Sequence, residues 1–180
     1  MRLYVMRHGP AEDRSATGRD ADRALTAEGK GRVQAVALHL QGQRGSTSTL
    51  RILSSPLRRA RETAEIMAGV LQEAERVGAS ELGPELREEL ALDADLPQTL
   101  RLASEALGTG VDTLLVGHAP TVDHLLRSLA PGDGQKPPAT VAGGFCTAMV
   151  VALEPHEAAP RWRMVDMIDP RTFRDTENHR

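Results

Sequence analysis

The chain has 180 residues, of which 40% are hydrophobic and 26% charged, a composition typical of one globular domain. Its net charge of −3, with only two phenylalanines, one tyrosine and one tryptophan, gives no basic surface or stacking platform for nucleic acid. The single cysteine, Cys146, excludes an internal disulfide and metal sites built from several cysteines. The chain has neither the apolar run of about 20 residues that a membrane helix needs nor the pattern of a signal peptide at its start. We therefore expect a cytoplasmic enzyme that binds neither nucleic acid nor membrane, and its oligomeric state stays open.

Segments with strand-like and helix-like patterns alternate along the chain. This order predicts an α/β fold in three layers, with a mostly parallel open sheet between helices. Residues 3–6 and 50–53 are short apolar runs that end at turn-forming residues, so they are predicted to be strands. Helices are predicted from about Ala27, with Thr26 as N-cap, and again soon after residue 56. The second of these helices is expected to bury Ala60, Ala64, Met67 and Leu71.

The same alternation continues in the second half of the chain. Asp95 and Gln98 have the spacing of a capping box, which predicts a helix after Asp95. The apolar face of that helix is expected to consist of Leu100, Ala103 and Leu107. Residues 111–116 are predicted to form a strand followed by a further helix. That last helix is expected to bury Val122, Leu125, Leu126 and Leu129.

The end of the chain is predicted to add an edge hairpin to the sheet. Residues 131–144 are rich in glycine and proline and are predicted to be a long loop. Residues 145–153 and 162–167 are β-forming and are expected to pair with each other. We expect one domain over residues 1–169 and a flexible tail over residues 170–180.

Basic residues follow three of the predicted strands. Arg7 and His8 end the first, Arg58 and Arg59 open the helix after the second, and His118 follows the third. Ligands of open α/β sheets bind at the carboxyl ends of the strands. A single histidine or arginine pair there also fits a structural role or a solvated helix start, but cations at a helix N-terminus are unfavourable without an anion. Three such sites together predict an anion-binding pocket, most simply for a phosphoryl group.

The same residues carry a family resemblance. Residues 6–9 (MRHG), 55–64 (SPLRRARETA) and 116–118 (VGH) resemble the motifs of the histidine phosphatase superfamily, the phosphoglycerate mutase-like proteins. Residues 23–29 (RALTAEG) resemble the segment that leads into the first helix of that family. The match runs from the first residue to about residue 153. The short segment between the second and third motifs leaves little room for a substrate-capping insertion, so the chain most resembles the small bacterial phosphohistidine phosphatases.

The resemblance implies a role for each residue of the pocket. His8 would be the nucleophile and would carry a covalent phosphohistidine, while Arg7, Arg59 and His118 would bind the phosphoryl group. Gly9 would let the backbone approach the phosphate closely. A neutral imidazole is a competent nucleophile near pH 7, and phosphoryl transfer mainly requires positioning and positive charge. No metal or cofactor is therefore expected, and no spacing around His8 and His118 supports a metal site.

The proton donor is less clearly indicated by the sequence. Residues 86–88 (LRE) resemble the donor motif of the family, which makes Glu88 the candidate general acid. Other acidic residues lie nearby, and an exposed acidic face is the alternative interpretation. The resemblance to the small phosphohistidine phosphatases also allows that no donor is present, because imidazole is a better leaving group than an alkoxide.

Three functions are compatible with these residues. The first is a metal-independent phosphatase that works through phosphohistidine on His8 and removes phosphate from phosphohistidine of a signalling protein. The second is a broad phosphomonoesterase for small metabolites such as a sugar phosphate, a nucleotide or a cofactor precursor. The third, from another class, is a non-catalytic phosphate-binding scaffold, because a fold does not determine its function.

Overall fold

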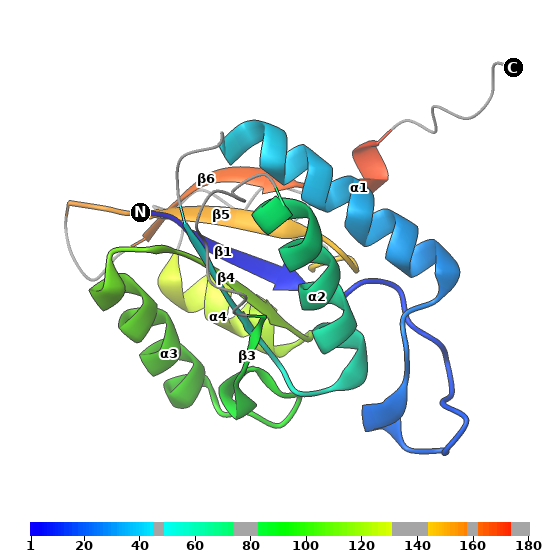
Figure 1. The fold of residues 1–180 in the computed structure, drawn as a ribbon. Coiled ribbons are helices and arrows are strands. Elements are labelled where there is room, and N and C mark those ends of the chain that lie inside the picture. The colour runs from blue at the N-terminus through cyan, green and yellow to red at the C-terminus, as the bar shows by residue number, and fades with distance from the viewer. Residues whose placement is uncertain (45–48, 74–82, 131–143, 158–161, 174–180) are drawn as a thin grey trace, which may run out of the picture.

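A computed structural model of the protein describes residues 1–44, 49–73, 83–130, 144–157 and 162–173. The six strands of its sheet are β1 (Leu3–Arg7), β2 (Leu50–Ser54), β3 (Glu85–Leu86), β4 (Asp112–Gly117), β5 (Val150–Pro155) and β6 (Trp162–Ile168). They lie in the order β3-β2-β4-β1-β5-β6. The first four strands in this order are parallel, and β5 and β6 are each antiparallel to the preceding strand. The predicted mostly parallel sheet with a C-terminal edge hairpin is confirmed (Figure 1).

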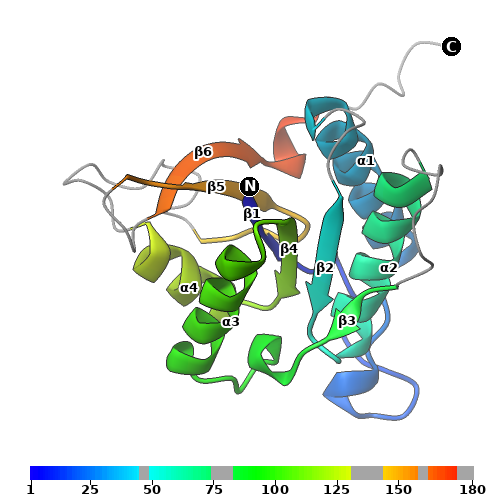
Figure 2. The same ribbon diagram turned by 60° about the vertical axis from the view of Figure 1, so that its left-hand side comes forward.

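Helices cover both faces of this sheet. The helices are α1 (Ala27–Arg44), α2 (Arg58–Glu73), α3 (Leu96–Thr109) and α4 (Thr121–Leu129), with short 3-10 helices η1 (Asp20–Asp22), η2 (Glu88–Leu90) and η3 (Pro170–Thr172). Helices α1 and α2 lie on one face, and α3 and α4 lie on the other (Figures 1 and 2). Each pair buries its own apolar cluster against the strands. The protein is therefore a three-layer α/β structure, as the sequence predicts.

Local sequence signals account for the ends and faces of most helices. The Thr26 hydroxyl accepts a hydrogen bond from the Gly29 N–H at 2.9 Å, as an N-cap of α1 does. The Asp95 carboxylate accepts one from the Gln98 N–H at 2.8 Å and caps α3. The residues predicted to be buried in α2 and α4 are all buried: Ala60, Ala64, Met67, Leu71, Val122, Leu125, Leu126 and Leu129.

The predicted face of α3 is correct for Ala103, which is buried, and in part for Leu100, which packs against the core, but wrong for Leu107. Leu107 is 36% exposed, and the residues that α3 buries are Thr99, Leu102, Ala103 and Ala106. The Thr99 hydroxyl donates hydrogen bonds to the carbonyl oxygens of Glu89 and Asp95. Because these bonds satisfy its hydroxyl, a polar residue can face inward. A pattern of apolar residues alone therefore misplaces the buried face of α3.

The strand predicted over residues 145–153 starts only at Val150. The preceding residues form a turn in which the Met149 N–H bonds to the Cys146 carbonyl and Ala148 has a φ of 66°. The Ala148 N–H also bonds to the carbonyl oxygens of Arg7 and His8. The apolar run is therefore divided between a strand and a turn that closes over the end of β1.

Two predictions concern segments that the structure describes only in part. The loop predicted over residues 131–144 lies outside the described residues except for Gly144. Helix η3 begins one residue beyond the predicted domain end, and residues 174–180 of the predicted tail are also outside the description. The domain boundary stays a prediction. Among the described helices, none is long and apolar enough to cross a membrane.

Candidate active site

The ends of β1 and β4 bring the two predicted histidines together. Arg7 of β1 pairs with Gly117 of β4, so the next residue of each strand, His8 or His118, emerges at the same edge. The His8 N–H donates to the Gly117 carbonyl at 3.0 Å. The centroids of the two imidazole rings lie 5.0 Å apart. The two motifs, more than a hundred residues apart in sequence, therefore form one site.

Helix α2 supplies the inward-facing arginine. Arg59 is 2% exposed, and its Nε–H donates to Nε2 of His8 at 3.3 Å. Arg58, the first residue of the helix, is exposed and forms an ion pair with Glu62 at 2.8 Å. The resemblance assigned Arg59 rather than Arg58 to the pocket. Of these two arginines, Arg59 is the one that contacts His8.

The hydrogen bonds of His8 define its tautomer. Its Nδ1 lies 2.7 Å from the Gly9 carbonyl oxygen, which can only accept, so Nδ1 carries the proton. Nε2 therefore bears the lone pair, on the side where Arg59 lies. Burial, with the nearby charges of Arg59 and Arg7, lowers the pKa of His8 to about 4. The ring is neutral near pH 7 and presents a nucleophilic nitrogen.

Two buried nitrogens at the site have no hydrogen-bond partner among the described residues: Nε of Arg7, which is a donor, and Nδ1 of His118. Arg7 is held by a bond from Nη1 to the Phe145 carbonyl at 2.6 Å. His118 is 1% exposed, and burial lowers its pKa to about 3. Buried donors are normally paired, and the chemical group that would pair donors beside two guanidinium groups is an anion.

Gly9 has a structural reason to be glycine. Its N–H donates to the Thr63 hydroxyl at 3.0 Å. A Cβ at this position would come within 2.5 Å of Cγ2 of Val33 in α1. Close packing of the loop on α1 thus requires glycine here, whereas the predicted contact of Gly9 with phosphate stays a prediction.

Sequence reasoning missed the contact between Asp20 and the arginine. Asp20, in η1, accepts from Arg59 twice, with its carboxylate at 3.0 Å from Nη2 and its carbonyl oxygen at 2.9 Å from Nη1. A bond to Arg23, with a smaller contribution from Arg59, lowers the pKa of Asp20. An acidic residue just before the motif at residues 23–29 is the only signal in the sequence that could have pointed to it. Arg59 therefore connects the nucleophile to an exposed carboxylate.

Glu88 lies outside this cluster. It is the first residue of η2 and is exposed, and no recorded hydrogen bond joins it to the histidines or arginines of the site. It lines a hollow of about 520 Å³ together with residues of η2 and α3, and none of the four pocket residues lines that hollow. Its proposed role as proton donor stays a prediction.

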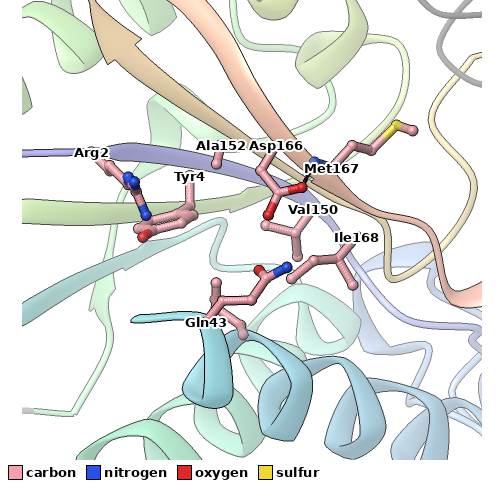
Figure 3. A pocket seen from close by; sticks show the side chains of 9 residues that line it. Arg2, Tyr4, Gln43, Val150, Ala152, Asp166, Met167 and Ile168 are labelled. Carbon is pink, nitrogen blue, oxygen red and sulfur yellow. Dashed lines mark hydrogen bonds between the residues drawn. The ribbon is translucent and has the colours of Figure 1, made fainter. Parts of the chain in front are cut away.

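Three hollows elsewhere on the described residues, of about 10, 550 and 520 Å³, have no histidine in their lining. No group of three or more His, Cys, Asp or Glu residues within the described ranges could hold a metal ion. The hollow between α1 and the strands β5 and β6 lies near Arg2 and Tyr4, at the amino end of β1 (Figure 3). Its volume of about 10 Å³ has room for about one water molecule. The end of the sheet that bears His8 is thus the candidate active site.

Comparison with known proteins identifies the family of this chain. A model of the histidine phosphatase superfamily, branch 1, matches residues 3–90. An uncharacterized protein of Picosynechococcus sp. is 38% identical in an alignment of 143 positions that covers 74% of this chain and 75% of that protein. The solved structure of the protein histidine phosphatase SixA complexed with tungstate is 27% identical, with a TM-score of 0.75 over 94% of this chain and 97% of that one. The chain belongs to the histidine phosphatase superfamily.

Further solved structures support this assignment for the fold as a whole. A putative phosphohistidine phosphatase SixA from Agrobacterium tumefaciens is 28% identical, with a TM-score of 0.71 over 94% of this chain and 97% of that chain. A mycobacterial glucosyl-3-phosphoglycerate phosphatase shares the fold at 19% identity, with a TM-score of 0.59 over 91% of this chain and 96% of that chain. This member of the histidine phosphatase superfamily is a phosphatase with the phosphoglycerate mutase-like fold, as expected from its sequence.

Proposed function

We propose that the protein is a metal-independent phosphatase that forms a covalent phosphohistidine on His8 and acts on phosphohistidine of other proteins. The observation that carries this proposal is the state of His8: a buried neutral ring, with its proton on Nδ1 and the lone pair of Nε2 next to Arg59. Such a nitrogen can attack phosphorus without first losing a proton. The surrounding donors match the charge that a transferring phosphoryl group carries.

The reaction has two displacements at phosphorus. In the first, Nε2 of His8 attacks, a P–N bond forms, and the substrate imidazole, protonated on its other ring nitrogen, departs as neutral imidazole with the electron pair of the bond that breaks. Arg7, Arg59 and His118 hold the phosphoryl oxygens, and the Gly9 carbonyl accepts from the Nδ1–H of the charged ring. In the second, water attacks phosphorus, the P–N bond breaks, and inorganic phosphate leaves with His8 neutral again. Fixed positive charge from two arginines takes the part that a metal ion has in other phosphatases.

None of the carboxylates described near the site is a suitable general acid, which favours phosphohistidine as substrate. An alkoxide leaving group needs a general acid, whereas an imidazole departs more easily. Among the described residues, Asp20 is the carboxylate that contacts Arg59, and its lowered pKa keeps it ionised and therefore a poor acid. Glu88 is exposed, and no hydrogen bond or ion pair in the described structure joins it to His8, Arg59 or His118. Two similar structures above 25% identity are a protein histidine phosphatase and a putative phosphohistidine phosphatase.

A substrate panel in the presence of a chelator tests the proposal. We expect wild type to hydrolyse a phosphohistidine peptide much faster than alkyl phosphates, and His8→Ala to hydrolyse neither. His124→Ala is the matched control, because His124 is an exposed histidine on α4. Loss of activity with chelator would refute metal independence, and equal rates on alkyl phosphates would indicate a broad phosphomonoesterase. Phosphate binding without any turnover would indicate a scaffold.

A further inference from the structure

The His118 ring is held by a serine at the end of β2. Nε2 of His118 lies 2.9 Å from Oγ of Ser55, and both side chains are buried. The Ser55 backbone N–H donates to the Val116 carbonyl at 2.9 Å, so Ser55 is fixed to β4, the strand that His118 directly follows. The other ring nitrogen, Nδ1, is buried and has no partner among the described residues. A neutral imidazole carries one proton, either on Nδ1 or on Nε2. Nδ1 is a donor in the first case and an acceptor in the second.

Counting hydrogens at Ser55 distinguishes the two tautomers. Its Oγ already accepts from the Leu57 N–H at 3.3 Å. If Nε2 of His118 carried the proton, it would donate to Ser55, and the hydroxyl hydrogen of Ser55 would have no recorded acceptor in the described structure. If Nδ1 carries the proton, the hydroxyl of Ser55 donates to Nε2 and both of its roles are satisfied. Each arrangement leaves one buried donor without an acceptor in the free protein, the Ser55 hydroxyl in the first and Nδ1–H of His118 in the second. The first also leaves Nδ1 of His118 as an unpaired acceptor, so the second arrangement is favoured.

We propose that Ser55 is a positioning residue that holds His118 in the Nδ1–H tautomer, so that Nδ1 donates to the phosphoryl group. Burial keeps His118 neutral over the physiological range, so the tautomer matters. Without Ser55, nothing recorded would hold the proton on Nδ1, and Nδ1 could direct a lone pair at the bound anion. The effect on catalysis rests on the proposed function, but the tautomer is a property of the free protein.

The test compares Ser55→Ala with Ser54→Ala. Ser54 is also fully buried, and its hydroxyl donates to the Ser55 carbonyl at 3.0 Å rather than to a histidine. Nitrogen-15 NMR of the His118 ring in ligand-free protein reports the tautomer, with His118→Gln to assign its signals. We expect Nδ1–H in wild type and Ser54→Ala, and a shift toward Nε2–H in Ser55→Ala. Steady-state kinetics with an aryl phosphate should show kcat/KM of Ser55→Ala lower by about 100-fold, mainly through kcat, which is the lower end for loss of one transition-state donor.

A hydroxyl restored in Ser55→Thr should recover the wild-type tautomer and much of kcat. An Nε2–H tautomer in wild type would overturn the proposal, and this result needs no variant to fold. An unchanged tautomer in Ser55→Ala would also overturn it. Failure of the proposed function would look different, because wild type would then lack turnover while the NMR signature of Ser55 remained.

Discussion

Burial separates the roles of the charged groups in the pocket. Arg7 and Arg59 carry permanent positive charge, whereas burial lowers the pKa of His8 to about 4 and that of His118 to about 3. The same arginines also disfavour protonation of the imidazoles, although less than burial does. The pocket can therefore bind an anion and still present a neutral nucleophile.

The lowered pKa of His8 predicts an unusual pH profile. Protonation removes the nucleophilic lone pair, so kcat/KM should fall as pH falls through about 4 and should show no histidine limb near 6.5. Steady-state rates on two aryl phosphates of different second pKa would separate the enzyme limb from ionisation of the substrate, which occurs near pH 6. A limb near 6.5 that stays in place when the substrate changes would contradict this expectation.

The four charged or ionisable residues of the pocket could be predicted because each follows or opens an element with a clear pattern. Arg7, His8, Arg59 and His118 all lie at the ends of periodic segments, where the fold class itself places a ligand. The contacts of Asp20 and Ser55 could not be predicted in this way. They depend on the path of a loop and on the direction of a hydroxyl group, and hydrophobic periodicity reports neither.

At the scale of elements, the loop between β1 and α1 reaches back to the nucleophile through η1. Asp20 occupies two donors of Arg59, although its side chain is 52% exposed. A phosphoryl group near His8 would share Arg59 with this carboxylate and would be repelled by it. The loop therefore contributes both an anchor for Arg59, through its carbonyl, and a competing negative charge.

Removal of that charge should strengthen anion binding. We expect Asp20→Ala to bind inorganic phosphate about two- to fivefold more tightly at low salt, an effect of the size of a partly exposed charge interaction. Asp22→Ala removes the same charge from η1, but Asp22 pairs with Arg19 at 3.6 Å and no recorded bond joins it to Arg59. Calorimetric titration of both variants decides the matter. Weaker binding by Asp20→Ala would mean that the carboxylate mainly positions Arg59.

Helix α1 supports the active-site loop through a glycine contact. A Cβ on Gly29 would overlap the backbone carbonyl of Pro10, two residues after His8, whereas a Cβ on Gly31 would meet nothing within 4 Å. Gly29→Ala should therefore lower the free energy of unfolding by about 1–3 kcal/mol and reduce activity by moving the loop. Gly31→Ala should instead raise stability by about 0.5–1 kcal/mol. Thermal unfolding of both variants measures this, and equal effects of the two changes would contradict the packing argument.

Element positions were more predictable than element phases and ends. The N-caps Thr26 and Asp95 and the buried faces of α2 and α4 agree with the sequence patterns. The face of α3 agrees only in part, because hydrogen bonds allow Thr99 to be buried. The late start of β5 at Val150 has a tertiary cause, since the turn before it bonds to the end of β1 and holds Arg7.

At the scale of the whole molecule, strand order explains how distant motifs form one site. The adjacent parallel strands β2, β4 and β1 end at the same edge, so each delivers its motif there. Helices on both faces bury the sheet and leave this edge for the ligand. The alternation of elements predicted the parallel sheet, but it could not predict the pairing order or the two-residue strand β3, because both depend on contacts between distant segments.

The most direct test of the account is to trap the phosphoryl group on the enzyme. Wild type is mixed rapidly with a phosphohistidine peptide and quenched in alkali, in which phosphohistidine survives, and its peptides are analysed by mass spectrometry. We predict a phosphoryl group on His8, lost on acid treatment, present in His124→Ala and absent from His8→Ala. Turnover without a phosphoryl group on His8, or with one on another residue, would contradict the proposed mechanism.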